Sequence, residues 1–174
     1  MKRSLVIILL LALLPAGCRK GNDTKTSGTV TIDNRLYGTM DYYALGFSFS
    51  KDSKISTHGN PGPDITIDND GTLGDVRLLD NNFLDSFYKA GEFSDATSAS
   101  QAFDMLMIPV VKQYVVWADS IKPNQIWIFK TGDDHYAKLR IISTDSKVIE
   151  NRNYAECTFE WVYQPDGSFT FPVK

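Results

Sequence analysis

The sequence predicts a β-rich fold of the α+β class, a mostly antiparallel sheet with one kinked helical segment. Several stretches alternate apolar and polar side chains with a period of two, which is typical of half-buried strands. Short connections rich in Gly, Pro and Asp separate these stretches, as they do in antiparallel hairpins. One segment follows a helical period instead, and a proline interrupts it.

The first strand is predicted at residues 43–50. Its alternate positions divide into an apolar face and a face of small residues, namely Tyr43, Leu45, Phe47 and Phe49 against Ala44, Gly46, Ser48 and Ser50. Further on, Asp-Asn-Asp-Gly at 68–71 predicts a hairpin turn. An EF-hand calcium loop is excluded there, because Thr66 and Arg77 would occupy its first and last ligand positions.

The helical segment is predicted at residues 98–120. Ser98 followed by Gln101 is the pattern of a capping box. Apolar residues then recur every three or four positions, as on one helix face: Phe103, Met107, Val110, Tyr114 and Trp117. Pro109 disrupts a regular helix, so we expect a kink or two short helices there. The β-branched residues of the second half leave a strand as the alternative.

The last fifty residues predict an antiparallel meander. Residues 125–130 are apolar on both faces, which indicates a strand covered on two sides. In the next strand, 135–142, apolar residues alternate with Lys138 and Arg140. The turn residues at 132–134 connect these two strands. Pro-Asp-Gly at 165–167 predicts a further hairpin, between the strand 156–163 and a last strand at 168–173.

Aromatic residues and the internal cysteine are expected to belong to the core. Cys157 alternates with three aromatic residues, Phe159, Trp161 and Tyr163, so this stripe predicts a buried, unreactive thiol. The three tryptophans at 117, 127 and 161 lie in apolar contexts, which favours packing over a role as ligand platforms.

The first seventeen residues predict an export signal. Lys2 and Arg3 precede an apolar run at 5–14, which is shorter than the 20 or so residues of a membrane span. The run ends in Leu-Pro-Ala-Gly-Cys at 14–18, which resembles the bacterial lipoprotein signal, in which small residues precede a lipidated cysteine. Cys18 is therefore the predicted lipidation site. A secretory peptide cleaved nearby, or an uncleaved anchor, is the alternative.

This interpretation divides the chain into a signal peptide at 1–17, a lipidated tether at 18–28 and a single β-rich domain at 29–174. The signal peptide contains Lys2 and Arg3, so the mature chain keeps 16 of the 18 basic residues and all 21 acidic ones. Such an acidic body attracts neither nucleic acid nor anionic lipid. Membrane attachment then depends on the acyl chains at Cys18.

Motifs of catalysis are missing from the sequence. It contains no Walker loop, dinucleotide fingerprint, CxxC, HExxH or nucleophile elbow. Its two histidines, His58 and His135, lie in loop-like or turn-like stretches, where solvated side chains are expected. The sequence therefore predicts that the protein is not an enzyme.

Three stretches resemble the HmuY-like lipoproteins of Bacteroidetes. They are the strand and Pro-Asp-Ile-Thr-Ile-Asp segment within 45–68, the hairpin at 125–143, and FEWVYQPDGSFTF at 159–171. The resemblance implies a β-rich outer-membrane lipoprotein that binds haem and passes it to a TonB-dependent receptor. It also implies axial histidine or methionine ligands, for which the candidates are His58, His135, Met40 and Met105.

The acidic residues beside His135 argue against a site formed by both histidines. Asp133 and Asp134 would repel the haem propionates. The function expected from the sequence is that of an outer-membrane lipoprotein with a non-enzymatic ligand-binding or accessory role, with haem binding as the resemblance implies. The alternative is a structural lipoprotein that contacts another outer-membrane protein and binds no small ligand.

Overall fold

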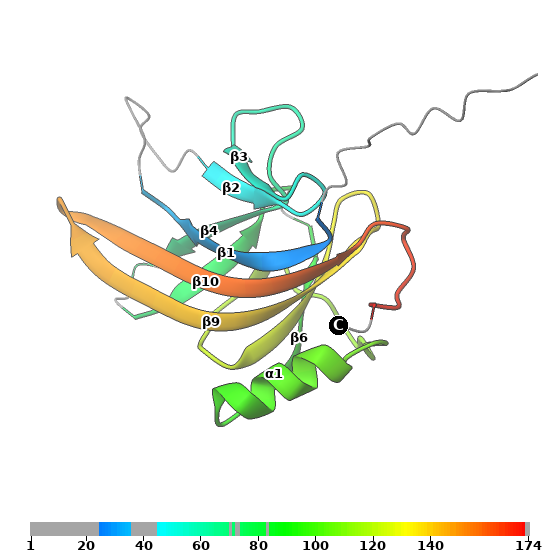
Figure 1. Cartoon of the computed structure of the whole chain (residues 1–174). Helices are drawn as coiled ribbons and strands as arrows, with labels where there is room; N and C mark the ends of the chain where they lie inside the picture. Colours follow the sequence, from blue (N-terminus) through cyan, green and yellow to red (C-terminus); the bar gives the residue numbers. More distant parts are fainter. Residues whose placement is uncertain (1–24, 36–44, 70, 72–73, 83, 173–174) are drawn as a thin grey trace, which may run out of the picture.

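The computed structural model describes residues 25–35, 45–69, 71, 74–82 and 84–172. Two antiparallel sheets face each other, and one helix covers the outer face of the first sheet (Figure 1). The elements are β1 (Ser27–Asp33), β2 (Leu45–Ser48), β3 (Ser53–Ser56), β4 (Ile65–Asn69), β5 (Val76–Asp80), β6 (Phe87–Glu92), α1 (Ala96–Met105), β7 (Trp117–Ala118), β8 (Gln125–Lys130), β9 (Tyr136–Ile149) and β10 (Arg152–Gln164). The predicted β-rich fold is confirmed at this level.

The first sheet contains the predicted meander and has the strand order β1-β10-β9-β8-β6. The 132–134 turn joins β8 to β9 as expected. Glu150 and Asn151 both have positive φ, 51° and 62°, as in the type I′ turn that suits a hairpin, and they join β9 to β10. These two long strands extend beyond the rest of the molecule as a ribbon (Figure 1).

The second sheet has the order β3-β2-β4-β5-β7. β4 pairs with β5 as an antiparallel hairpin, as expected, but Asp68 and Asn69 of the turn predicted at 68–71 belong to β4, so the connection begins later. Gly46 allows β2 to approach β4 closely, because a Cβ at this position would lie 2.4 Å from the carbonyl oxygen of Ile65. Residues 43 and 44 of the predicted first strand lie outside the described residues.

The main core lies between the two sheets and is rich in aromatic rings. Cys157, Phe159, Trp161 and Tyr163 all point into it, with exposed fractions of 4% or less, so the predicted stripe is confirmed. The Trp161 ring lies 5.3 Å from Phe47 and 5.9 Å from Phe49, measured between centroids. Burial raises the pKa of the Cys157 thiol, which keeps it protonated and inert.

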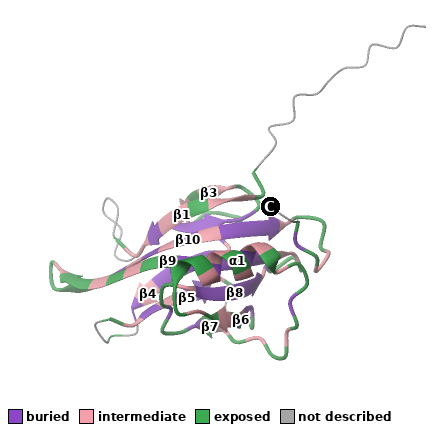
Figure 2. Ribbon diagram, turned by 60° about the horizontal axis from the view of Figure 1, so that its bottom comes forward, coloured by how far each residue is buried: buried purple, intermediate pink, exposed green. Residues whose placement is uncertain are grey.

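A second, smaller core lies between α1 and the outer face of the first sheet (Figure 2). The two faces of β8 are therefore both covered, as its sequence predicted. Lys138 occupies a polar position in the alternation of β9, yet it is fully buried. Its ammonium group donates to the carbonyl oxygens of Phe103, at 2.6 Å, and Leu106, at 3.0 Å. These carbonyl groups lie in the last turn of α1, where backbone acceptors lack partners within the helix. The positive charge of Lys138 also interacts favourably with the negative end of the helix dipole.

The predicted helix at 98–120 is wrong in both length and start. Asp95, not Ser98, is the N-cap, and its side chain accepts a hydrogen bond from the Ser98 backbone. The helix ends at Met105, and of the apolar stripe only Phe103 is buried. The segment after the helix is irregular, apart from a bridge at Val115 and the short strand β7. Pro109 thus ends the helical pattern rather than kinking it.

Three further expectations differ from the structure. No strand forms at 168–172, where Phe171 instead packs into the second core, so the last predicted hairpin is wrong. Trp117 is 40% exposed, with Arg77 over its ring. β1 begins at Ser27, so the last two residues of the expected tether belong to a strand. Within the described part of the chain, no helix is long and apolar enough to cross a bilayer.

Candidate functional site

A pocket of about 560 Å³ opens where the loops at one end of the two sheets meet. We call it the loop-end pocket. Its lining comes from the β2–β3 turn, the loop before β4, the β5–β6 loop, the β8–β9 turn and the end of β10. The lining residues are Ser48, Ser50, Asn60, Pro61, Gly62, Pro63, Asp64, Asn82, Leu84, Gly132, Asp133 and Tyr163. Loops held by a rigid scaffold in this way are where binding sites concentrate.

The β5–β6 wall of the pocket is held by Asp80, a fully buried carboxylate. It accepts hydrogen bonds from the Ser86 hydroxyl at 2.5 Å and from the backbone N–H groups of Asn82 and Leu84 at 2.8 and 3.2 Å. A charged acceptor with three donors fixes the loop that carries Asn82 and Leu84. Asp80 is thus a positioning residue behind the pocket.

Asp64 is the carboxylate at the inner side of the pocket. Its Oδ2 accepts a hydrogen bond of 2.7 Å from the Phe49 backbone N–H. Burial raises the pKa of Asp64 above its usual 3.8, and the negative charges of Asp133 and Asp80 act in the same direction. A carboxyl group with a raised pKa in a concave site is a typical sign of function.

Asp133, His135 and Tyr163 form a connected group at the same end of the molecule. His135 Nδ1 lies 2.8 Å from the Tyr163 hydroxyl, in hydrogen-bond contact, and 3.3 Å from Asp133 Oδ2. The Thr131 hydroxyl donates to Asp133 and helps to fix the turn. Burial, followed by the charges of Asp133 and Asp64, raises the pKa of Tyr163 to about 12. His135 is therefore a partly buried, hydrogen-bonded residue and not a solvated one.

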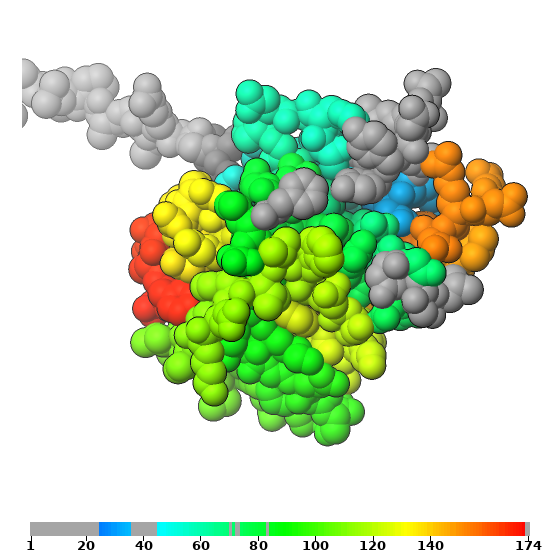
Figure 3. Space-filling model, turned by 180° about the vertical axis from the view of Figure 1, so that it is seen from behind, coloured from blue at the N-terminus to red at the C-terminus, as the bar shows by residue number. Residues whose placement is uncertain are grey.

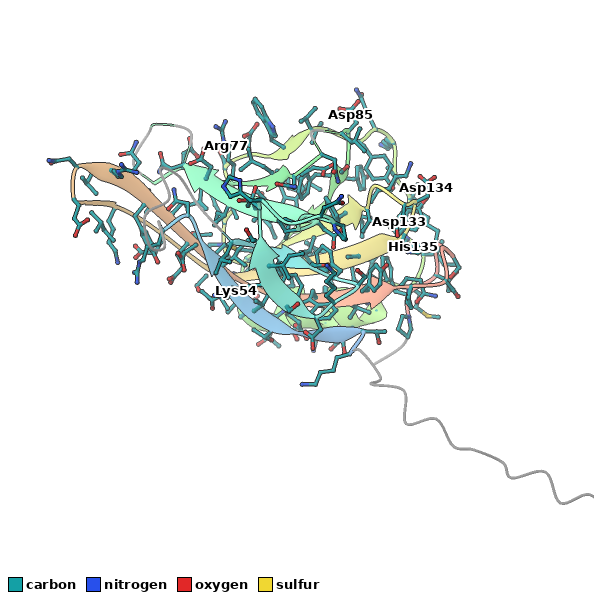
Figure 4. The ribbon with its side chains drawn as sticks, turned by 90° about the horizontal axis from the view of Figure 1, so that it is seen from above. Lys54, Arg77, Asp85, Asp133, Asp134 and His135 are labelled. Carbon is teal, nitrogen blue, oxygen red and sulfur yellow. The ribbon has the colours of Figure 1, made fainter. Side chains whose placement is uncertain are left out.

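The pocket is negatively charged. Its lining contains two carboxylates and neither lysine nor arginine. The nearby Lys130 does not neutralise the two carboxylates of the lining, because it is paired at 2.6 Å with Asp134, which lies outside the lining. Figure 4 shows Asp133, Asp134 and His135 together at one end, with Lys54 and Arg77 away from them. Such a site attracts positively charged groups.

A second cavity of about 530 Å³ lies beside the base of the β9–β10 turn. It is lined by Asn34, Arg35, Ile149, Glu150, Arg152, Asn153 and Tyr154. Its walls come from the end of β1 and a single hairpin. The loop-end pocket collects five separate segments and a carboxyl group with a raised pKa, so it is the stronger candidate site.

The ligand candidates from the sequence are not gathered in either cavity. His58 is exposed in the loop between β3 and β4, and Met105 is 79% exposed at the end of α1. Neither of them, nor His135, lines a cavity described above. Cys18 and Met40 lie outside the described residues. Within the described ranges, no three His, Cys, Asp or Glu side chains are grouped to hold a metal ion.

Sequence inspection did not identify Asp64 and Tyr163 as site residues. Asp64 follows Gly62-Pro63 and precedes a strand, which looks like an ordinary turn. One signal could have identified Asp64: it directly precedes an apolar strand. A carboxylate buried there costs free energy, so its presence suggests a specific role. Tyr163 ended an apolar stripe and was correctly predicted to be buried, but its hydroxyl partner comes from another hairpin.

Comparisons with known proteins found no match to the chain among family models, curated proteins or solved structures.

Proposed function

We propose that this protein is an outer-membrane lipoprotein, anchored through Cys18, that binds a small organic cation in the loop-end pocket. The role is non-enzymatic: the pocket holds and presents a ligand. The observation that carries this proposal is the pair of carboxylates, Asp64 and Asp133, in a pocket whose lining has no basic residue.

The chemistry of the lining suits an ammonium group. Such a group has three N–H donors and no acceptor. Carboxylate oxygens of Asp64 and Asp133 and the hydroxyls of Ser48 and Ser50 supply acceptors around the pocket. Burial, with a smaller contribution from the charges of Asp133 and Asp80, raises the pKa of Asp64, and a bound cation would favour the charged form of this carboxyl group. Anionic ligands are disfavoured by the same charges.

The first prediction concerns Asp64→Asn. This change keeps an oxygen that can accept from the Phe49 N–H, but it removes the charge. Affinity for a polyamine such as spermidine should fall about 10- to 100-fold, the range expected for one charge-assisted hydrogen bond. The ligand-induced rise in melting temperature, measured for wild type and variant, checks this result.

Asp64→Asn should weaken ligand binding, but it should not lower the stability of the ligand-free protein. Because the pKa of Asp64 is raised in the folded state, folding favours its protonated form, and this contribution is lost as pH rises from 3.8 through the raised value. Without ligand, Asp64→Asn should therefore be at least as stable as wild type at neutral pH. Asp145→Asn, which removes one charge from the exposed β9–β10 ribbon, is the control and should leave binding unchanged. Equal affinity of all three proteins would contradict the proposal.

The second prediction concerns the anchor. Cys18→Ala removes the site of acylation, and the acidic domain has no attraction of its own to anionic lipid. The variant should fail to incorporate palmitate, and its migration should show an unprocessed signal peptide. Metabolic labelling with a fatty acid, followed by gel electrophoresis, measures both. Equal labelling of wild type and variant would contradict lipidation at Cys18.

Haem binding and transfer to a TonB-dependent receptor stay predictions from the HmuY-like resemblance. The loop-end pocket gives them no support, since its carboxylates repel propionates. A haemin titration followed by absorption spectroscopy distinguishes the two ligands. A Soret band of defined stoichiometry that spermidine does not displace would favour haem over a cation.

A further inference from the structure

An uncharged apolar segment begins at Met105, the last residue of helix α1, and projects several large side chains to solvent. Four of its residues have large exposed fractions: Met105 79%, Met107 42%, Ile108 65% and Val110 78%. No charged residue occurs between Asp104 and Lys112. We call residues 105–110, which include these four, the apolar segment. A contiguous exposed apolar patch marks a contact surface for another body.

The backbone of this segment is fixed although its side chains are exposed. Lys138 Nζ binds the carbonyl oxygen of Leu106 at 3.0 Å, and the Phe171 N–H donates to the Met107 carbonyl at 2.8 Å. Pro109, within the segment, is buried. The exposed side chains are thus held outward by a fixed backbone. Figure 3 shows the corresponding green-to-lime atoms projecting at the lower left, below the red C-terminal residues.

The apolar segment lies at the end of the sheet where the chain enters the domain. Ser27 at the start of β1 pairs with Val162, and Val162 pairs with Lys138, which binds the end of α1. Adjacent strands lie ~4.8 Å apart, so the Cα atoms of Ser27 and Lys138 are separated by about 10 Å. The start of β1 and the end of α1 lie toward the same side in Figure 1.

The length of chain before β1 limits the distance of the domain from the anchor. Nine residues, 18–26, precede Ser27 if Cys18 is the first residue of the mature protein. Fully extended, they span about 30 Å. The end of the sheet that carries Ser27 therefore lies within about 30 Å of the anchor, and the apolar segment lies at that end.

We propose that the apolar segment inserts into the lipid surface beside the acyl anchor. This inference rests on the proposed lipidation of Cys18. The acidic domain and the uncharged segment together favour a neutral, zwitterionic lipid surface, because anionic lipids repel the domain. The four side chains enter the interfacial region and fix the orientation of the domain. The β9–β10 ribbon then points away from the anchored end of the sheet (Figure 1).

The test uses the full-length lipidated protein in vesicles of phosphatidylethanolamine and phosphatidylcholine. Val110→Cys places a thiol in the segment, and Val148→Cys, at an exposed site on the ribbon, is the matched control. Cys157 is fully buried with a raised thiol pKa, so a maleimide fluorophore labels only the new site. Lipids with spin-labelled acyl chains quench fluorophores that enter the bilayer.

We expect spin-labelled lipid to quench at least half of the fluorescence at residue 110 and to leave that at residue 148 within a tenth of its unquenched value. Equal quenching at both sites, or none at residue 110, overturns the inference. Emission at residue 110 could instead change with protein concentration but not with spin-labelled lipid. That result would mean that the apolar segment contacts a second copy of the chain, and it would also overturn the inference. Failure of the wild-type protein to float with vesicles contradicts the anchoring itself, which separates the two proposals.

Discussion

Trp161→Ala is expected to lower the free energy of unfolding by about 3–5 kcal/mol, the usual range for removing a large buried aromatic side chain. Trp161 has no exposed surface and contacts the ring of Phe47 on β2 and that of Phe49 in the turn that follows β2. Its removal leaves a cavity between the two sheets that the surrounding strands cannot fill without shifting. Urea denaturation followed by circular dichroism measures the effect.

Trp161→Phe is the matched control and should lose less stability, because a ring still occupies most of the space. A midpoint for Trp161→Ala close to that of wild type would mean that the two sheets do not pack through this residue. The sandwich described above would then be incorrect, and with it the placement of the loop-end pocket.

Lys138→Met is expected to destabilise the protein by about 1.5–3 kcal/mol, the range for hydrogen bonds to a charged group. Methionine fills a similar volume but cannot donate to the carbonyl oxygens of Phe103 and Leu106. The Leu106 carbonyl oxygen would lose the lysine donor, and the Phe103 carbonyl oxygen would keep its hydrogen bond of 3.3 Å from the Leu106 N–H. Thermal or chemical denaturation measures the change, and loss of helical signal should accompany it.

Lys147→Met is the control for the loss of a lysine charge. Lys147 pairs with Asp145 on the exposed ribbon, where the exposed fractions of the two side chains are 54% and 47%. This surface ion pair and the contact of the Lys147 ammonium with the Tyr154 ring contribute little, so the change should stay within about 1 kcal/mol of wild type. If both lysine variants lose the same stability, Lys138 does not cap the helix.

Alternation predicted the strands well where one face of the sheet is apolar. The stripe that contains Cys157 and Trp161 was expected to be buried, and it is. Alternation does not reveal the burial of Lys138, because a buried lysine and an exposed lysine give the same period-two pattern. Only the position of α1, which supplies the carbonyl acceptors, distinguishes them.

Periodicity alone overestimated the helix. The spacing of Met107, Val110 and Trp117 matched one helix face, but their side chains are exposed and Pro109 ends the pattern. The observed N-cap, Asp95, lies three residues before the expected helix start at Ser98. Serine suits the N-cap position, but Ser98 is the third residue of the helix and donates its backbone N–H to Asp95. Local sequence gave no reason to prefer one over the other.

The candidate site was beyond sequence analysis because its parts come from distant segments. Asp64 and Asp133 lie 69 residues apart in the sequence. Their charges influence each other only in the folded protein. The turn at 132–134 was predicted correctly as a connection, whereas its contact with Tyr163 through His135 depends on the pairing of β9 with β10. Cavities of this kind follow from topology rather than from motifs.

Amide chemical-shift mapping with spermidine tests most directly whether the loop-end pocket binds an organic cation. The predicted result is a saturable shift of the amides of Phe49, Gly132 and Asp133, with the amides of the β9–β10 ribbon unchanged. The same titration of Asp64→Asn should show these shifts only at about 10- to 100-fold higher concentration. Linear, unsaturated shifts spread over the acidic surface, or saturable shifts confined to the ribbon, would contradict the claim.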